Sequence, residues 1–185
     1  MALLCLVALG SPALAQNAPM HEIAASLRAG QYRWATGAAV GATPEIVVSL
    51  VLQRAYVYRG SALVGVASVS TGKRGKETPP GEYSVLQKAR WHRSNLYSAA
   101  PMPFMQRLTW DGIALHAGYN PGYPASHGCI RLPPEFARAL FDVVPLGARV
   151  TVADYPMELP VRLEVEDFGL GIGEPRLDYA AEVFG

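Results

Sequence analysis

The feature that most limits the fold is a series of short apolar runs separated by turn residues. Ile46–Leu52 is an apolar, β-branched run, and Arg54–Tyr58 continues it. A turn signal at Arg59-Gly60 follows, and Ala62–Ser70 then resumes the apolar pattern. A strand, a turn and a second strand in this order predict a β-hairpin.

Further short runs extend this pattern toward the C-terminus. Only Pro134–Val144 has the helical period, with its apolar residues on one face and prolines at its start. The other runs are strand candidates: Gly81–Leu86, Leu108–Leu115, Ala148–Val152 and the alternating Val161–Val165. Together these elements predict a mostly-β domain with one core α-helix.

The segment Trp91–Phe104 shows no clear periodicity and contains two prolines and several aromatic residues. An irregular loop of this length inside a compact domain is usually functional or mobile. We expect His92, which lies in it, to face solvent.

The ends of the chain differ in character from its middle. Residues 1–15 have an apolar start and a small-x-small pattern at Ala13 and Ala15, which predict a signal peptide cleaved before Gln16. The apolar start is far shorter than the roughly 20 residues that span a bilayer, so we expect no stable membrane span after cleavage. Residues 16–43 are predicted to form an N-terminal segment and linker with a short helix at Ile23–Leu27. The folded domain is expected to begin near Pro44, at 44–153, and to be followed by an acidic extension at 154–185.

Composition excludes some classes of protein. Half of the 185 residues are hydrophobic and 17% are charged, which argues against disorder. The net charge is +7 over residues 1–153 and −6 over residues 154–185. The basic part would suit a polyanionic polymer, or it is simply a solvated surface. No Lys/Arg run exceeds two residues and no nucleic-acid motif is present, so we expect no nucleic-acid partner.

One short stretch contains the residue types of a cysteine nucleophile with a base. His116, His127 and Cys129 lie within fourteen positions of one another. Gly128 precedes the cysteine, where a bare backbone would let a substrate come close. The prolines and glycine between His116 and Ser126 predict a tight, stiff loop, with Tyr119 and Tyr123 at the rim of the site. We expect His116 at the end of a strand over Leu108–Leu115.

Cys129 would be the only cysteine after signal cleavage, because Cys5 lies in the discarded segment. A lone thiol in an oxidising compartment is either a reactive group or a buried small hydrophobe. The glycine and histidines around it favour a reactive thiol.

These residues also carry a resemblance to a known family. Ser126-His127-Gly128-Cys129-Ile130-Arg131, with His116 and Gly118 upstream, resembles the signature of the L,D-transpeptidase (YkuD) catalytic domain, a family that remodels bacterial peptidoglycan. The likeness extends to Ser70-Thr71-Gly72 and Thr78-Pro79-Pro80-Gly81-Glu82-Tyr83, and in all to Ile46–Val152. The His116–Ser126 connection is shorter than in many members. The resemblance implies a YkuD-like β-sandwich with a helix alongside, and a wall or lid formed by the aromatic loop.

The resemblance also implies roles for single residues. Cys129 would be the nucleophile and His116 the base, oriented by a backbone carbonyl, although His127 is an alternative base and is otherwise a supporting residue. The backbone N–H groups of Gly128 and Cys129 would stabilise the oxyanion. Arg131, two residues beyond the nucleophile, would share its face of a strand and bind a carboxylate or brace the loop. Ser126 is expected to be a hydrogen-bonding brace.

Several functions remain open from the sequence alone. The implied reaction is acyl transfer on a peptidoglycan stem peptide through a thioester, with a stem peptide, lipoprotein or amino acid as amine acceptor. Water as acceptor would make the protein a carboxypeptidase or endopeptidase. A wall-binding or zinc-holding module is the non-catalytic alternative, although no Cys-x-x-Cys pair is present. A papain-like protease is disfavoured because its Cys-Gly-Ser-Cys-Trp pattern is absent. We expect no cofactor, a monomer, and a location in the periplasm or cell envelope.

Overall fold

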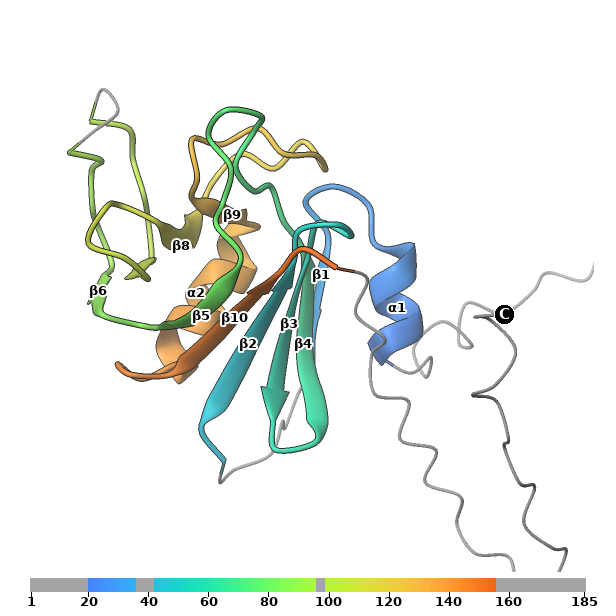
Figure 1. The fold of residues 1–185 in the computed structure, drawn as a ribbon. Helices are drawn as coiled ribbons and strands as arrows, with labels where there is room; N and C mark the ends of the chain where they lie inside the picture. The colour runs from blue at the N-terminus through green and yellow to red at the C-terminus, as the bar shows by residue number, and fades with distance from the viewer. Residues whose placement is uncertain (1–19, 36–41, 96–98, 156–185) are drawn as a thin grey trace, which may run out of the picture.

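The computed structural model describes residues 20–35, 42–95 and 99–155 (Figure 1). These residues form two β-sheets and two helices. The six-stranded sheet has the order β1-β4-β3-β2-β10-β5, and the four-stranded sheet has the order β6-β7-β8-β9. The elements are α1 (Met20–Ser26), β1 (Tyr32–Trp34), β2 (Pro44–Ser49), β3 (Arg54–Arg59), β4 (Ala62–Ser68), β5 (Gly81–Ser84), β6 (Gln87–Ala89), β7 (Met105–Arg107), β8 (Ala114–Ala117), β9 (Ile130–Leu132), α2 (Pro134–Val143) and β10 (Arg149–Ala153).

Most neighbouring strands are antiparallel, and the two parallel pairs determine the topology. In the smaller sheet β8 pairs with β9 in parallel, with Leu115 opposite Ile130 and His116 opposite Arg131. Parallel neighbours need a crossover connection, so the chain between them must leave the sheet and return. That connection is residues 118–129, which contain the cysteine motif. In the larger sheet β10 runs parallel to β2, and α2 leads the chain from β9 to β10.

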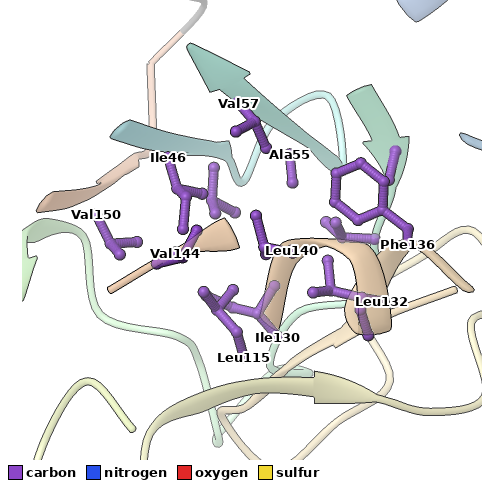
Figure 2. Packing of buried hydrophobic residues seen from close by; sticks show 14 of the residues in the cluster. Ile46, Ala55, Val57, Leu115, Ile130, Leu132, Phe136, Leu140, Val144 and Val150 are labelled. Carbon is purple, nitrogen blue, oxygen red and sulfur yellow. The ribbon is translucent and has the colours of Figure 1, made fainter. Parts of the chain in front are cut away.

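The core lies between the two sheets, with α2 packed into it. Figure 2 shows side chains from the larger sheet, the smaller sheet and α2 pointing toward one another. Phe136, Ala137 and Leu140 of α2 are fully buried, as the helical period predicted. Lys88 on β6 donates hydrogen bonds to the carbonyl groups of Phe141 and Val144 at the end of this helix. A cation at a helix C-terminus is favourable because unpaired carbonyl groups gather there.

Described residues of the N-terminal segment pack against the domain that was expected to begin near Pro44. β1 pairs with β4, and the Trp34 ring meets the Phe136 ring edge-on at 5.3 Å between centroids. The predicted short helix is confirmed as α1, which lies on the outer face of the larger sheet (Figure 1). Arg54 of β3 donates to the carbonyl groups of Ala24 and Leu27 at the end of α1.

Two sequence-based strands were placed wrongly. The run expected to continue from Ile46–Leu52 into Arg54–Tyr58 is broken by a turn into β2 and β3. Ser49 Oγ accepts the Leu52 N–H, and Gln53, with φ +51°, reaches back to the Leu50 carbonyl. Side-chain hydrogen bonds thus form a turn that has neither glycine nor proline.

The expected strand over Leu108–Leu115 is also wrong. It is mostly the turn between β7 and β8, in which Thr109 Oγ1 accepts the Ile113 N–H and the Leu108 N–H donates to the Ile113 carbonyl. His116 therefore lies inside β8 rather than at the end of a strand. The strands predicted at Ala62–Ser70, Gly81–Leu86 and Ala148–Val152 are confirmed as β4, β5 and β10, with shifted ends.

The predicted signal peptide and the strand at Val161–Val165 lie outside the described residues. Within residues 20–35, 42–95 and 99–155, no helix is long and apolar enough to cross a membrane.

The contact between Trp34 and Phe136 gives a first prediction. Trp34→Ala should lower the free energy of unfolding by about 2–4 kcal/mol, because it removes a large, partly buried ring that packs against the core. Urea denaturation measures the change. Trp91→Ala is the matched control, since the Trp91 side chain is 82% exposed and its loss should change stability by less than about 0.5 kcal/mol. Equal stabilities of the two variants would contradict the inclusion of β1 in the folded domain.

Candidate active site

The crossover between β8 and β9 brings most of the predicted site residues to one cavity. The cavity has a volume of about 710 Å³. Of the residues singled out from the sequence, it is lined by His116, Gly118, Tyr119, Ser126, His127, Cys129 and Arg131. Tyr123 and Gly128 do not line it. Cys129 and Arg131 both line this cavity, although Cys129 lies just before β9 and not on the strand.

Cys129 is partly buried and is a free thiol. Its Sγ donates to the Gly112 carbonyl at 3.3 Å, and Met102, Met105 and Ala114 pack beside it. Burial raises the pKa of the thiol, because a thiolate loses hydration in this apolar setting. The Ala114 backbone and the positive charges of the nearby arginines oppose that effect more weakly. At neutral pH the resting group is therefore a thiol.

His116 is 7% exposed, and its Nδ1 lies 2.8 Å from the Ala117 carbonyl oxygen. A carbonyl only accepts, so Nδ1 carries the proton and Nε2 is the basic nitrogen. Burial lowers the pKa of His116, and the positive charges of Arg131 and His92 lower it further, whereas the hydrogen bond to Ala117 raises it. The resting pair is a neutral imidazole and a neutral thiol.

Ser126 braces the turn before the cysteine, as predicted. Its Oγ donates to the Cys129 carbonyl at 2.5 Å and accepts the Gly128 N–H at 3.1 Å. This second bond already uses the Gly128 N–H in the ligand-free site. The Cys129 N–H remains as the candidate donor.

Gly128 is required for a reason other than the close approach of a substrate. Its φ is +116°, which side chains rarely adopt, and a Cβ there would lie 2.7 Å from Ile113 Cδ1. The residue thus faces Ile113 and not the cavity. Gly118 has a different constraint, since a Cβ on it would lie 3.2 Å from Cγ of Arg131. The Arg131 stem is therefore packed against the β8 end of the loop.

A second segment holds the cysteine loop in place. The buried Thr78 Oγ1 accepts the Gly72 N–H at 2.9 Å and donates to the Gly128 carbonyl at 2.7 Å. Ser70 exchanges two backbone hydrogen bonds with Arg131. The Ser-Thr-Gly and Thr-Pro-Pro-Gly elements of the sequence are thus the support of the loop.

Gln53 is a positioning residue that the sequence analysis missed. Its amide donates to Thr71 Oγ1 at 2.7 Å and accepts the Thr71 N–H at 3.0 Å. No local pattern could have identified it, because its partner is 18 residues away.

The aromatic residues of the loop and rim take different positions. Tyr119 is 79% exposed on the cavity wall, and His127 is also exposed there. Tyr123 is exposed away from the wall, and its carbonyl accepts the Ser70 hydroxyl at 2.8 Å. The expectation that both tyrosines rim the cavity is therefore met by Tyr119 alone.

The described residues of the segment Trp91–Phe104 form one wall of the cavity, as the resemblance implied for this region. Trp91, Met102 and Phe104 are among its lining residues. The Met102 N–H donates to the His92 carbonyl, and the Phe104 N–H donates to the Arg90 carbonyl. Backbone hydrogen bonds therefore join the beginning and the end of this segment.

A second cavity, of about 410 Å³, also has Cys129 in its wall. It is lined by His92, Arg107, Trp110 and Asp111 among others. Cys129 and Met102 belong to the walls of both cavities. Among the residues that the structure describes, no group of three His, Cys, Asp or Glu side chains could hold a metal ion, which gives the zinc alternative no support.

This fold and this site agree with one protein family. The L,D-transpeptidase catalytic domain (YkuD) profile matches residues 43–152, so the chain belongs to that family. It is 27% identical over 139 residues to "Probable L,D-transpeptidase YbiS" of Escherichia coli K12, a match that covers 61% of this chain and 45% of YbiS. It is 29% identical over 129 residues to L,D-transpeptidase 1 of Mycobacterium tuberculosis, with 50% and 51% covered. The chain thus spans about half the length of these relatives.

Solved structures of the family have the same fold. An L,D-transpeptidase from Mycobacterium tuberculosis H37Rv is similar with a TM-score of 0.57 and 25% identity, over 62% of this chain and 59% of that one. The structure of the transpeptidase LdtMt1 in complex with imipenem also gives 0.57, with 26% identity over 61% and 60%. The YkuD-like arrangement of mostly β-structure with one core helix is confirmed.

The neutral state of His116 and Cys129 predicts how the alkylation rate of the thiol depends on pH. Because burial raises the pKa of Cys129, alkylation by iodoacetamide should reach half its maximal rate above about pH 8.5, the value of a free thiol. Mass spectrometry at a series of pH values measures the rate. The same protein unfolded in guanidinium is the control and should titrate near the ordinary value. A half-maximal rate below pH 7 in the folded protein would instead indicate a resting thiolate and imidazolium.

Proposed function

We propose that this chain is a cysteine-dependent L,D-transpeptidase that acts on peptidoglycan stem peptides. The observation that carries the proposal is that His116 and Cys129 line one cavity, with His116 Nδ1 fixed on the Ala117 carbonyl. This bond leaves Nε2 as the basic nitrogen of a general base for Cys129, the one thiol among the described residues that line the cavity. Membership of the YkuD family supports the same reaction class.

In the proposed acylation, Nε2 of His116 takes the proton of the Cys129 thiol as the sulfur attacks the carbonyl at an L-centre of the stem peptide. The Cys129 N–H stabilises the negative oxygen that forms. When the tetrahedral intermediate collapses, the C–N bond breaks and the imidazolium gives its proton to the leaving terminal D-amino acid. The product is a thioester on Cys129.

In the proposed second half-reaction, an amine of the acceptor attacks the thioester, and His116 takes its proton. The proton then returns to the sulfur as the C–S bond breaks, which restores the neutral pair. The buried surroundings of the thiol favour this neutral resting state, because an ion pair would have to form without full hydration. Proton transfer is then part of the attack and not a step that precedes it.

Arg131 supplies the positive charge of the cavity. It lines the same wall as Cys129, and its stem is held by the contact with Gly118. A guanidinium presents a fork of donors that matches a carboxylate, so we assign it to a carboxylate of the stem peptide. Its charge also favours the oxyanion and disfavours a protonated His116.

We further propose that the protein acts outside the inner membrane, in the periplasm or cell envelope. The support is the small-x-small pattern after the apolar start of the sequence, together with the location of peptidoglycan.

The thiol is tested with stem peptides. The mature protein should convert a tetrapeptide stem into a cross-linked or amine-exchanged product that mass spectrometry detects. Cys129→Ala should reduce this turnover by at least about 10³-fold, since it removes the nucleophile. Circular dichroism and a thermal melt confirm that the variant is folded. Wild-type turnover in Cys129→Ala would exclude the thioester mechanism, and release of the terminal residue without exchange would show that water is the acceptor.

The rate at which a carbapenem acylates Cys129 distinguishes the roles of His116 and His127. Imipenem, bound in the LdtMt1 structure, represents this class of compound. His116→Ala should slow formation of the Cys129 adduct by about 10²–10⁴-fold, because it removes the general base. His127→Ala is the matched control and should keep most of the rate, since His127 is exposed on the cavity wall. Intact-protein mass spectra follow the adduct with time. The reverse order of rates would assign the base to His127.

A further inference from the structure

The second cavity has a chemical character that the transfer reaction alone does not require. Its walls combine an aromatic ring from Trp110 with polar groups from His92, Arg107 and Asp111. Its volume of about 410 Å³ is within the range of small-molecule sites, about 300–1,000 Å³. A ligand that fills it must therefore offer both an apolar face and several hydrogen-bonding groups.

Trp110 is held in a fixed and exposed position. It lies in the turn between β7 and β8, where the Thr109 hydroxyl accepts the Ile113 N–H and the Gly112 N–H donates to the Thr109 carbonyl. The Arg107 guanidinium lies 5.9 Å from the centre of the indole. The Trp110 side chain is nevertheless 75% exposed. A cation over the ring orients it, and the exposed area remains for a ligand.

The same turn touches the thiol. The Gly112 carbonyl, two residues from Trp110, accepts the hydrogen bond from Cys129 Sγ. The backbone that carries Trp110 is therefore tied to the nucleophile through a short, hydrogen-bonded turn. A group bound on Trp110 would be held close to the acyl group on the sulfur.

We propose that Trp110, Arg107 and Asp111 form a saccharide-binding subsite that holds a sugar residue of the glycan strand. A pyranose ring has an apolar face of C–H groups, which stacks on an aromatic ring, and hydroxyl and acetamido groups, which pair with charged and amide side chains. The cavity offers this combination. The inference rests on the proposed function, because it is the stem peptide that brings a glycan strand to the site.

The reach of the stem peptide is compatible with this subsite. An extended chain spans about 3.3–3.6 Å per residue, so a stem of three or four residues places its sugar within about 10–15 Å of the attacked carbonyl. Cys129 lies on the walls of both cavities. A peptide in the larger cavity and a sugar in the smaller one can thus belong to one substrate or to two neighbouring strands.

The test compares one stem peptide in two forms, free and attached to its N-acetylglucosamine–N-acetylmuramic acid disaccharide. Trp110→Ala should lower kcat/KM for the disaccharide form by roughly three- to tenfold, the usual effect of losing one aromatic contact, and leave kcat/KM for the free peptide unchanged. Trp110→Phe should retain part of the preference. Leu146→Ala is the matched control, because it truncates an exposed apolar side chain that lines neither cavity.

Three outcomes would overturn the inference. The first is an equal loss on both substrates in Trp110→Ala, which would make the subsite one for peptide. The second is a selective rise in KM for amine acceptors without sugar in Asp111→Asn, which would assign the cavity to an ammonium group. The third is a failure of the wild-type protein to bind peptide-free glycan oligosaccharides. Calorimetry measures this binding and does not depend on turnover. Wild-type protein should bind them and Trp110→Ala should bind at least threefold more weakly, whereas no binding to wild type excludes the subsite.

Carbapenem acylation of Cys129 distinguishes this failure from that of the proposed function. A Trp110→Ala protein that acylates at the wild-type rate but shows no sugar preference refutes the subsite alone. A wild-type protein that neither acylates nor turns over stem peptide refutes the proposed function, and the calorimetry then decides the subsite by itself.

Discussion

The hydrogen-bonded support of the cysteine loop is the constraint on which the rest of the site depends. β8 and β9 are parallel neighbours, so the chain between them cannot be a tight turn and has to cross over. Thr78 ties this crossover to the Ser70–Gly72 segment through the Gly72 N–H and the Gly128 carbonyl. Each such buried bond contributes about 0.5–1.5 kcal/mol, and an unmatched partner would cost about 1–3 kcal/mol. Cys129 is therefore presented by a loop with few alternative conformations.

Burial of the thiol and the imidazole determines the chemistry that this geometry can support. Both groups are disfavoured in their charged forms by loss of hydration, which raises the pKa of Cys129 and lowers that of His116. An enzyme that kept a resting thiolate would need stronger compensation, such as a helix N-terminus or a closely paired cation. Here the nearby arginines and the Ala114 backbone only partly offset the effect of burial. Burial thus favours the neutral imidazole and thiol on which the proposed general-base role of His116 depends.

Packing outside the motif is equally specific. The core between the sheets is filled from both sides and from α2 (Figure 2), and its edge is completed by Trp34 from the N-terminal segment. Gly65 lies below the Trp34 ring, where a Cβ would be 2.7 Å from Cε3. The N-terminal segment, the larger sheet and α2 therefore form one packed unit, and α2 in turn carries the chain from the site strand β9 to β10.

The sequence alone determined the mostly-β composition, the amphipathic helix and the residue types of the site, because these depend on local periodicity and on a short motif. It did not determine where strands break, since Ser49 and Gln53 form a turn through side-chain hydrogen bonds without a glycine or proline signal. The turn at Thr109 does contain Gly112, but its apolar flanks were taken for one continuous strand. Only the tertiary structure showed that the Gly128 N–H is paired with Ser126 and that its carbonyl is paired with Thr78, 50 residues away. Burial comes from segments distant in the chain, and so the directions of the pKa shifts of Cys129 and His116 were decided by packing.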